Sequence, residues 1–256
     1  MLTYQAPICF YPTTVLVTKD MPLLNIVQQQ CMHAVVSADI LLKTLQIGLT
    51  PLIVENITQR PPLQAVNMHF FDSKCRSLLI ELFNVDRFYD ISVIVLSLIH
   101  DTDYTVDLLR QINNIQCKKL IIIDAKQKEY ALALKEQGLI DSFLDQTQHN
   151  ILVQRIEALQ WQYFVSITPS LCQILDIRYQ SIQWQQPDFA VWIMGLRKEL
   201  DIVEYYLADL SGKFVCVDKH CKIYYLQYTG DIYNREIHPV KLKLDYMRNM
   251  PDCMAQ

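Results

Sequence analysis

Uninterrupted apolar runs and helical patterns alternate through the first two thirds of the chain. The runs ISVIVLSL (91–98) and KKLIIID (118–124) do not alternate between apolar and polar positions, which is typical of strands buried on both faces of a sheet. Apolar residues spaced three and four apart predict helices at 105–114, 126–138 and 150–164. Strands alternating with helices of this length predict a doubly wound parallel α/β sheet.

Weaker patterns predict further elements of the same sheet. They indicate strands at 12–18, 34–36, 51–54 and 140–144, and helices at 23–32, 38–47 and 73–84. In a doubly wound sheet, sites lie beyond the carboxyl ends of the strands, near the point where the strand order reverses. The residues expected at that edge are Thr18 to Asp20, Ser97, Asp124 and Asp145.

The pattern changes after about residue 165. A polar stretch rich in glutamine is expected to be a linker, and a helix follows it. Three short aromatic-rich runs then predict an antiparallel meander. These segments are 176–188, 189–200, 204–209, 213–218 and 222–228. The sequence therefore predicts a parallel α/β domain over 1–165, with a long segment at 33–90, and a small α+β module over 166–256.

Composition narrows the classes of function. The chain has 256 residues, of which 51% are hydrophobic, so it can bury a large core. A net charge of −4 argues against a general nucleic-acid binder. With only five glycines, a Gly-rich phosphate loop is not expected. The eight cysteines are scattered and form no C-x-x-C pair, which favours buried, reduced thiols. The first residues do not resemble a signal peptide, so we expect a cytoplasmic protein. We also expect no membrane span.

Continuous stretches of the first 165 residues resemble the receiver domain of bacterial two-component response regulators. VLVTKDMPLLNIVQQQ (15–30) is similar to the first strand, acidic pair and first helix of that family. DISVIVLSLIHDTDYTVDLLRQI (90–112) is similar to the strand, acceptor aspartate, Met-Pro loop and helix. KKLIIIDA (118–125) and EQGLIDSFLDQTQHNILVQRIEAL (136–159) continue the likeness through the last two strands and the final helix. The resemblance implies a receiver, or flavodoxin-like, fold and a role in phosphorelay signal transduction.

The residues that carry the chemistry of this family are mostly replaced. The resemblance implies an acidic pair and an acceptor aspartate that hold Mg²⁺, and a Thr/Ser and a lysine that bind phosphoryl oxygens. Here the acidic pair is Lys19 and Asp20, the acceptor position is Ser97, the Thr/Ser position is Asp124, and the lysine position is Asp145, or Gln146 if the strand is shifted by one.

These replacements predict a pseudo-receiver that accepts no phosphoryl group. A serine hydroxyl is a weak nucleophile without a base or a metal, a lysine repels Mg²⁺, and Asp124 repels phosphate. We expect no catalytic residue, no metal and no cofactor. A second hypothesis is that Lys19 takes the place of the cation and pairs with Asp20, with Asp124 or with both.

Several residues allow two readings. Ser97 closes a buried strand as a small polar residue, which we favour, or is a regulated phosphoserine. The loop residues His100 to Asp103 are expected to be solvated rather than to bind metal, and Cys216, Asp218, His220 and Cys221 to be structural rather than a zinc site. The aromatic residues of the three C-terminal strands form a core or line a ligand pocket.

Three functions remain to be compared. The favoured one is a non-enzymatic signalling protein that binds a protein partner, or a second copy, through the face formed by 126–164. The first alternative is a transcriptional response regulator with a DNA-binding output domain. The nearly equal numbers of acidic and basic residues over 166–256 argue against it. The second alternative, a small-molecule sensor or enzyme in the C-terminal module, lacks a visible nucleophile–base pair.

Overall fold

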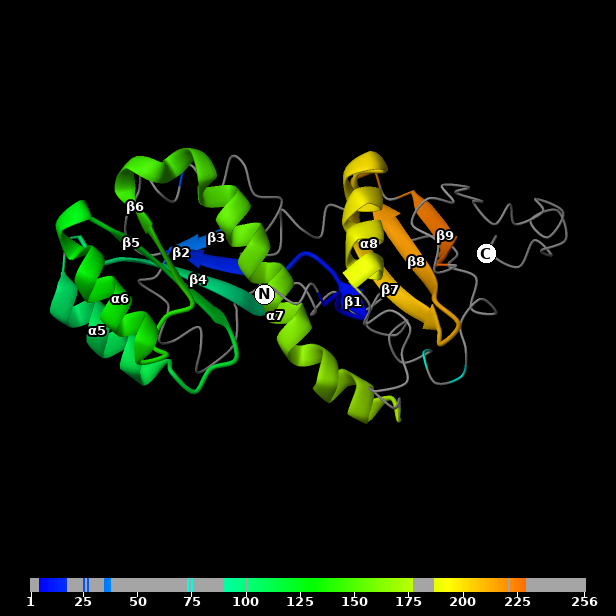
Figure 1. The fold of residues 1–256 in the computed structure, drawn as a ribbon, viewed down its shortest axis with the longest axis horizontal. Helices are drawn as coiled ribbons and strands as arrows, with labels where there is room; N and C mark the ends of the chain where they lie inside the picture. Colours follow the sequence, from blue (N-terminus) through cyan, green and yellow to red (C-terminus); the bar gives the residue numbers. More distant parts are fainter. Residues whose placement is uncertain are drawn as a thin grey trace, which may run out of the picture.

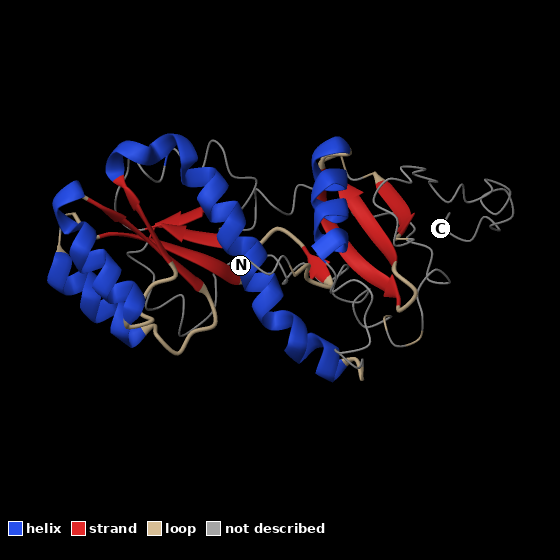
Figure 2. Cartoon of the chain, in the orientation of Figure 1, coloured by secondary structure: helices blue, strands red, loops and turns tan. Residues whose placement is uncertain are grey.

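The structure, a computed structural model, contains two β-sheets joined by one long helix (Figures 1 and 2). It describes residues 5–17, 25, 27, 35–37, 73, 75, 90–99, 101–176, 187–220 and 222–228. The predicted helices at 38–47 and 73–84 and the predicted strand at 51–54 lie outside these ranges, apart from Ser73 and Cys75. So does most of the predicted helix at 23–32, of which Asn25 and Val27 are described and helical.

The first sheet is parallel and has five described strands in the order β3-β2-β4-β5-β6. They are β2 (Thr14–Val17), β3 (Val35–Ser37), β4 (Ile91–Ser97), β5 (Lys118–Ile123) and β6 (Ser142–Asp145). Counted along the chain, this is the 2-1-3-4-5 order of flavodoxin-like doubly wound sheets. The predicted parallel α/β sheet is confirmed, and the strand order reverses between β2 and β4.

Strands β4 and β5 are buried because their successive side chains enter two different cores. Ile94 and Leu96 pack in a cluster with the helices α5 (Thr102–Gln111) and α6 (Lys128–Glu136). Val93 and Val95 point the other way, into a cluster with the first half of helix α7. Because both faces of the sheet are covered, an apolar side chain is favourable at every position, which explains the runs without alternation.

Side-chain caps mark the start of α5 and of the 3₁₀ turns that precede α6 and α7. α5 starts three residues earlier than predicted because the Asp101 carboxylate accepts a hydrogen bond from the backbone N–H of Tyr104. The predicted helix at 126–138 is divided into a short 3₁₀ turn, η5 (Ala125–Gln127), and α6. Gly138 follows α6 at φ +71°, the left-handed conformation that ends helices and favours glycine.

Helix α7 (Leu152–Ile174) ends ten residues beyond Phe164, the last residue of the predicted helix. It follows the 3₁₀ turn η6 (Gln146–Ile151) and continues through Pro169, which is exposed. Burial accounts for the extension, because Phe164, Thr168 and Cys172 lie on the side of the second half that faces the other sheet. One helix therefore covers both sheets.

The second sheet is antiparallel, in the order β1-β7-β8-β9. Its strands are β1 (Cys9–Phe10), β7 (Ile202–Asp209), β8 (Lys213–Asp218) and β9 (Ile223–Gln227), with helix α8 (Pro187–Glu199) packed on it. The predicted meander and the helix before it are confirmed. Of the predicted linker at 176–188, the described residues are Asp176, Pro187 and Asp188, and the last two belong to α8.

Two elements of the structure cross the predicted limit between 1–165 and 166–256. Strand β1, near the N-terminus, pairs with β7, and α7 passes residue 165 without interruption. The aromatic side chains at this junction form one core with the second sheet. They include Phe10, Tyr11, Trp161, Tyr163, Phe164, Tyr205 and Tyr206. Trp161, Tyr163 and Phe164, at the end of the predicted 126–164 face, therefore contact the chain's own second module.

Polar side chains at the same junction pair with each other. The Tyr11 hydroxyl donates to the Asp90 carboxylate at 2.8 Å, and burial and this carboxylate raise the pKa of Tyr11. The Gln160 amide donates to the Thr13 hydroxyl at 3.2 Å, and Thr13 shares a hydrogen bond with Ser92. These bonds connect the segment between β1 and β2 to the start of β4 and to α7. Within the part of the chain that the structure describes, no helix is both long and apolar enough to cross a membrane.

Candidate functional site

The candidate site is the carboxyl edge of the parallel sheet. Ser97 is the last residue of β4, opposite Ile122 of β5, and Ile123 of β5 lies opposite Asp145 of β6. Three of the residues singled out in the sequence, Ser97, Asp124 and Asp145, therefore stand at the ends of three adjacent strands. Lys19, Asp20 and His100 lie outside the described residues, so the ion pair proposed for Lys19 stays a prediction.

Ser97 is buried, with 7% of its surface exposed. Its hydroxyl oxygen accepts a long hydrogen bond, 3.4 Å, from the backbone N–H of Ile99. Its carbonyl oxygen accepts a 3.0 Å hydrogen bond from the hydroxyl of Thr105, which also donates to the Asp101 carbonyl. These contacts tie the end of β4 to the first turn of α5, as expected for a small polar residue that closes a strand.

The loop after Ser97 is held from two sides. The Thr102 hydroxyl donates to the carbonyl of Leu98 at 3.1 Å, and the Gln127 amide nitrogen donates to the same carbonyl at 3.0 Å. Gln127 also lies 3.4 Å from the Thr102 hydroxyl. A side chain of η5 thus fixes the β4–α5 loop, a link that the sequence interpretation did not include.

Asp124 caps the η5 turn. Its carboxylate accepts a 2.9 Å hydrogen bond from the backbone N–H of Lys126, and the Gln127 side-chain oxygen accepts one from the backbone N–H of Asp124. This reciprocal pair is a capping box. The second carboxylate oxygen of Asp124 accepts from the Gln146 amide at 3.3 Å. Asp124 therefore connects the ends of β5 and β6.

Asp145 forms a second capping box, one strand further along the sheet. Its carboxylate accepts from the backbone N–H and the hydroxyl of Thr147 at 2.9 and 2.7 Å, and its own N–H donates to Gln148. The two hydrogen bonds from Thr147 hold the pKa of Asp145 below its ordinary value. The spacing Asp-x-x-Gln occurs after both strands, and a search for capping boxes in the sequence would have found it.

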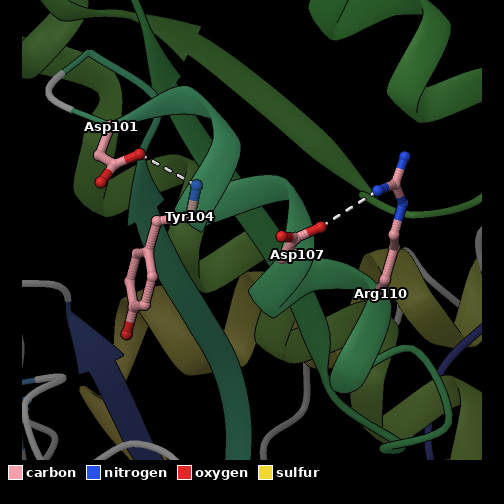
Figure 3. Close-up of polar contacts among 4 residues, drawn as sticks. All are labelled: Asp101, Tyr104, Asp107 and Arg110. Carbon is pink, nitrogen blue, oxygen red and sulfur yellow. Dashed lines mark hydrogen bonds and ion pairs between the residues drawn. The ribbon is translucent and has the colours of Figure 1, made fainter.

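Figure 3 shows polar contacts on α5, the helix that follows β4 in the chain. Asp101 bonds to the N–H of Tyr104, and Asp107 pairs with Arg110 at 3.1 Å. Asp107 and Arg110 are both exposed, and Asp101 already serves as a helix cap. Among the described residues, no group of three or more His, Cys, Asp or Glu side chains is placed to hold a metal ion.

Two of the residues considered for zinc in the second module, Cys216 and Asp218, have structural roles. Cys216 is fully buried in the core of the second sheet, and burial raises the pKa of its thiol. The Asp218 carboxylate accepts hydrogen bonds from the N–H groups of His220 and Lys222 and from the Tyr224 hydroxyl. Asp218 therefore organises the turn between β8 and β9. Cys221 lies outside the described residues.

The described cysteines are buried, and so is most of the aromatic cluster of the second sheet. The five cysteines are Cys9, Cys75, Cys117, Cys172 and Cys216. Burial raises the pKa of Cys117 and of Cys172 to about 11, which disfavours the reactive thiolate. Tyr205, Tyr206 and Phe214 are fully buried, which supports the core reading of the aromatic strands.

Gln127 gives a direct test of how the site's loop is held. Replacing Gln127 with alanine removes the acceptor for Asp124 N–H and the donor to the Leu98 carbonyl, and should lower the free energy of unfolding by about 1–2 kcal/mol. Urea unfolding followed by circular dichroism measures this change. Gln148→Ala is the matched control, since it removes only the 3.3 Å bond of an exposed capping box. An equal loss in both variants would contradict a special role for Gln127.

Comparison with known proteins finds a structural relative. No protein-family model and no curated protein sequence matches the chain. Among solved structures, the response regulator LqsR of Legionella pneumophila is similar, with a TM-score of 0.62 and 26% sequence identity. The similarity covers 86% of this chain and 66% of the LqsR chain, so this chain spans slightly less than two thirds of that protein. The fold is therefore response-regulator-like.

Proposed function

We propose that this chain is a response-regulator-like signalling protein whose receiver accepts no phosphoryl group. The observation that carries the proposal is the end of β4, where a buried serine, Ser97, stands at the position that the family resemblance gives to the acceptor aspartate. Transfer of a phosphoryl group needs a nucleophile and a cation that neutralises the accumulating charge. The next strand supplies Asp124, a carboxylate, where the resemblance implies a hydroxyl.

The bonding of the two carboxylates supports this proposal. Asp124 and Asp145 are both engaged with backbone N–H groups of the turns that follow them. They stabilise the loops at the sheet edge in one arrangement. A protein that does not change conformation in response to phosphorylation would need such a fixed arrangement. The solved structure to which the chain is similar is that of a response regulator, which supports a role in signalling.

The proposed mode of action is contact with another protein through the face formed by 126–164. Helix α6 supplies two exposed apolar side chains to it, Tyr130 at 43% and Leu132 at 42%. The side chains of Trp161, Tyr163 and Phe164 are not accessible to a partner, because they pack against the second module. The proposed interface therefore consists of α6, β6 and the first half of α7. We propose no enzymatic activity and a cytoplasmic location.

Labelling with a phosphoryl donor tests the proposal. Incubated with acetyl phosphate and Mg²⁺, the full chain is expected to gain no mass of a phosphoryl group in intact mass spectrometry. A beryllofluoride titration in the presence of Mg²⁺ should produce no binding heat. The variant Ser97→Asp should also stay unlabelled, because Lys19 still takes the place of a metal-binding carboxylate in the sequence.

Two results would refute the proposal, and they differ chemically. A label that neutral hydroxylamine removes from the wild-type chain would show that another carboxylate serves as acceptor. An acid-stable label at Ser97 would show that the serine itself is phosphorylated. A working receiver domain treated in parallel establishes that the reagents are active.

A further inference from the structure

Helix α8 carries apolar residues on the side that faces away from its own sheet. Phe189, Ala190, Ile193 and Leu196 are buried against the second sheet. On the outer side, Val191 is 54% exposed and Met194 is 40% exposed. A helix that covers a sheet usually has charged or polar residues on its outer face. Helix α8 lies beside the second sheet in Figure 1, and its outer face departs from that pattern.

Gly195 lies on the same face, at a place where a side chain would meet open space. Outside its own helix backbone and immediate neighbours, no atom lies within 4 Å of the place where a Cβ would stand. Its φ angle is not in the left-handed region, so the backbone does not require glycine. Glycine disfavours a helix interior relative to almost any other residue. What glycine does provide is a depression in the helix surface, into which a side chain of a neighbour fits.

Charges at the two ends of this face are opposite. Asp188 lies in the first turn and Lys198 in the last, and both are exposed. At about 100° per residue, Asp188, Val191, Gly195 and Lys198 share the side of α8 that is opposite Ile193. An antiparallel copy of the same helix, centred at residue 193, places Asp188 against Lys198 of the second copy. The same register places Val191 against Gly195 of the second copy.

We propose that the outer face of α8 binds a second copy of this chain through an antiparallel, two-fold helix pair. The contact is isologous, so each match occurs twice: two valine side chains fill two glycine depressions, and two ion pairs close the ends. One helix per copy gives an interface at the small end of specific contacts, below about 1,200 Å². The dimer is therefore weak and depends on concentration. This surface is distinct from the proposed 126–164 face.

Sedimentation velocity of the full chain, from about 1 to 300 µM, measures the association. Gly195→Leu should weaken it at least roughly tenfold, because the larger side chain fills the depression that Val191 needs. The substitution meets open space and favours the helix, so the variant should fold at least as well as the wild type. Circular dichroism and thermal unfolding check that expectation.

Charge reversal tests the register. Asp188→Lys alone and Lys198→Asp alone each create two like-charge contacts in a homodimer, and each should weaken association about fivefold or more. An equimolar mixture of the two variants restores both ion pairs in a heterodimer, and association should return to the wild-type level. The matched control uses the exposed pair on α5, Asp107→Lys and Arg110→Asp, which should change nothing, alone or mixed.

The outcomes decide the proposal. A wild-type chain that stays monomeric over the whole range overturns it. An association that is insensitive to Gly195→Leu but lost in Leu132→Glu also overturns it, and assigns the dimer to the 126–164 face. A mixture of the two charge variants that fails to associate excludes the antiparallel register. None of these results bears on phosphoryl labelling, so this proposal and the proposed function fail separately.

Discussion

Replacing Phe164 with alanine is expected to lower the free energy of unfolding by about 3–5 kcal/mol. Phe164 is completely buried, and its ring lies 5.0 Å from that of Phe10, 4.7 Å from that of Tyr11 and 5.3 Å from that of Tyr163, measured between ring centroids. Truncation leaves a cavity among side chains that come from the N-terminal segment and α7. This cluster joins α7 to the second sheet, and the first half of α7 packs on the parallel sheet. The lost stability should therefore affect both sheets.

Urea unfolding measured by circular dichroism gives the change in free energy, and hydrogen exchange locates it. We expect faster exchange in β7 as well as in β4 and β5, since α7 contacts both sheets. Gln162→Ala is the matched control, because residue 162 is on the same turn but exposed, and it should change stability by less than about 0.5 kcal/mol. Faster exchange confined to the second sheet would show that α7 does not couple the two.

This coupling is where the sequence interpretation and the structure differ most. The strands at 91–98 and 118–124 were predictable because the side chains of β4 and β5 point alternately into one of two cores. Nearly every position is therefore apolar, and this run is visible in the sequence. β1 has only two residues, and its partner β7 is almost two hundred positions away. So short a segment has no period of its own, and no local pattern can reveal such a pairing.

Helix α7 illustrates a second reason why prediction from sequence stops short. A proline at 169 normally indicates the end of a helix, and the predicted helix ends before it. The structure continues the helix to Ile174, because the second half buries Phe164 and Cys172 against the other sheet. Tertiary packing outweighs the local cost of the proline, and that packing depends on residues far away in the chain.

At the candidate site, the sequence predicted where the residues lie better than it predicted their hydrogen-bond partners. Ser97, Asp124 and Asp145 do lie at strand ends on one edge. Their partners were not foreseen: Asp124 and Asp145 each cap the turn that follows, and Gln127 and Gln146 link neighbouring strand ends. A family resemblance directs attention to the positions of the family's functional residues. The same residues also form a capping box, which is a local pattern that can be recognised without reference to any family.

Asp218 is the residue for which we expect the second large effect. It is 5% exposed, and its carboxylate accepts two backbone N–H bonds of 2.8 Å, from His220 and Lys222, and one hydroxyl bond of 3.1 Å, from Tyr224. Asp218→Ala leaves three donors without this acceptor in the β8–β9 turn. Hydrogen bonds to a charged group are stronger than neutral ones, so the free energy of unfolding should fall by about 2–4 kcal/mol.

Asp218→Asn separates this structural role from metal binding. The asparagine oxygen can still accept both backbone bonds, and its amide can donate to the Tyr224 hydroxyl, so the loss should stay within about 1 kcal/mol. Unfolding of both variants in urea, with and without zinc, makes the comparison. Stabilisation of the wild type by zinc that both variants lose would instead show that Asp218 is a metal ligand. Since its two oxygens are already engaged by the turn, we expect zinc to leave the stability of all three chains unchanged.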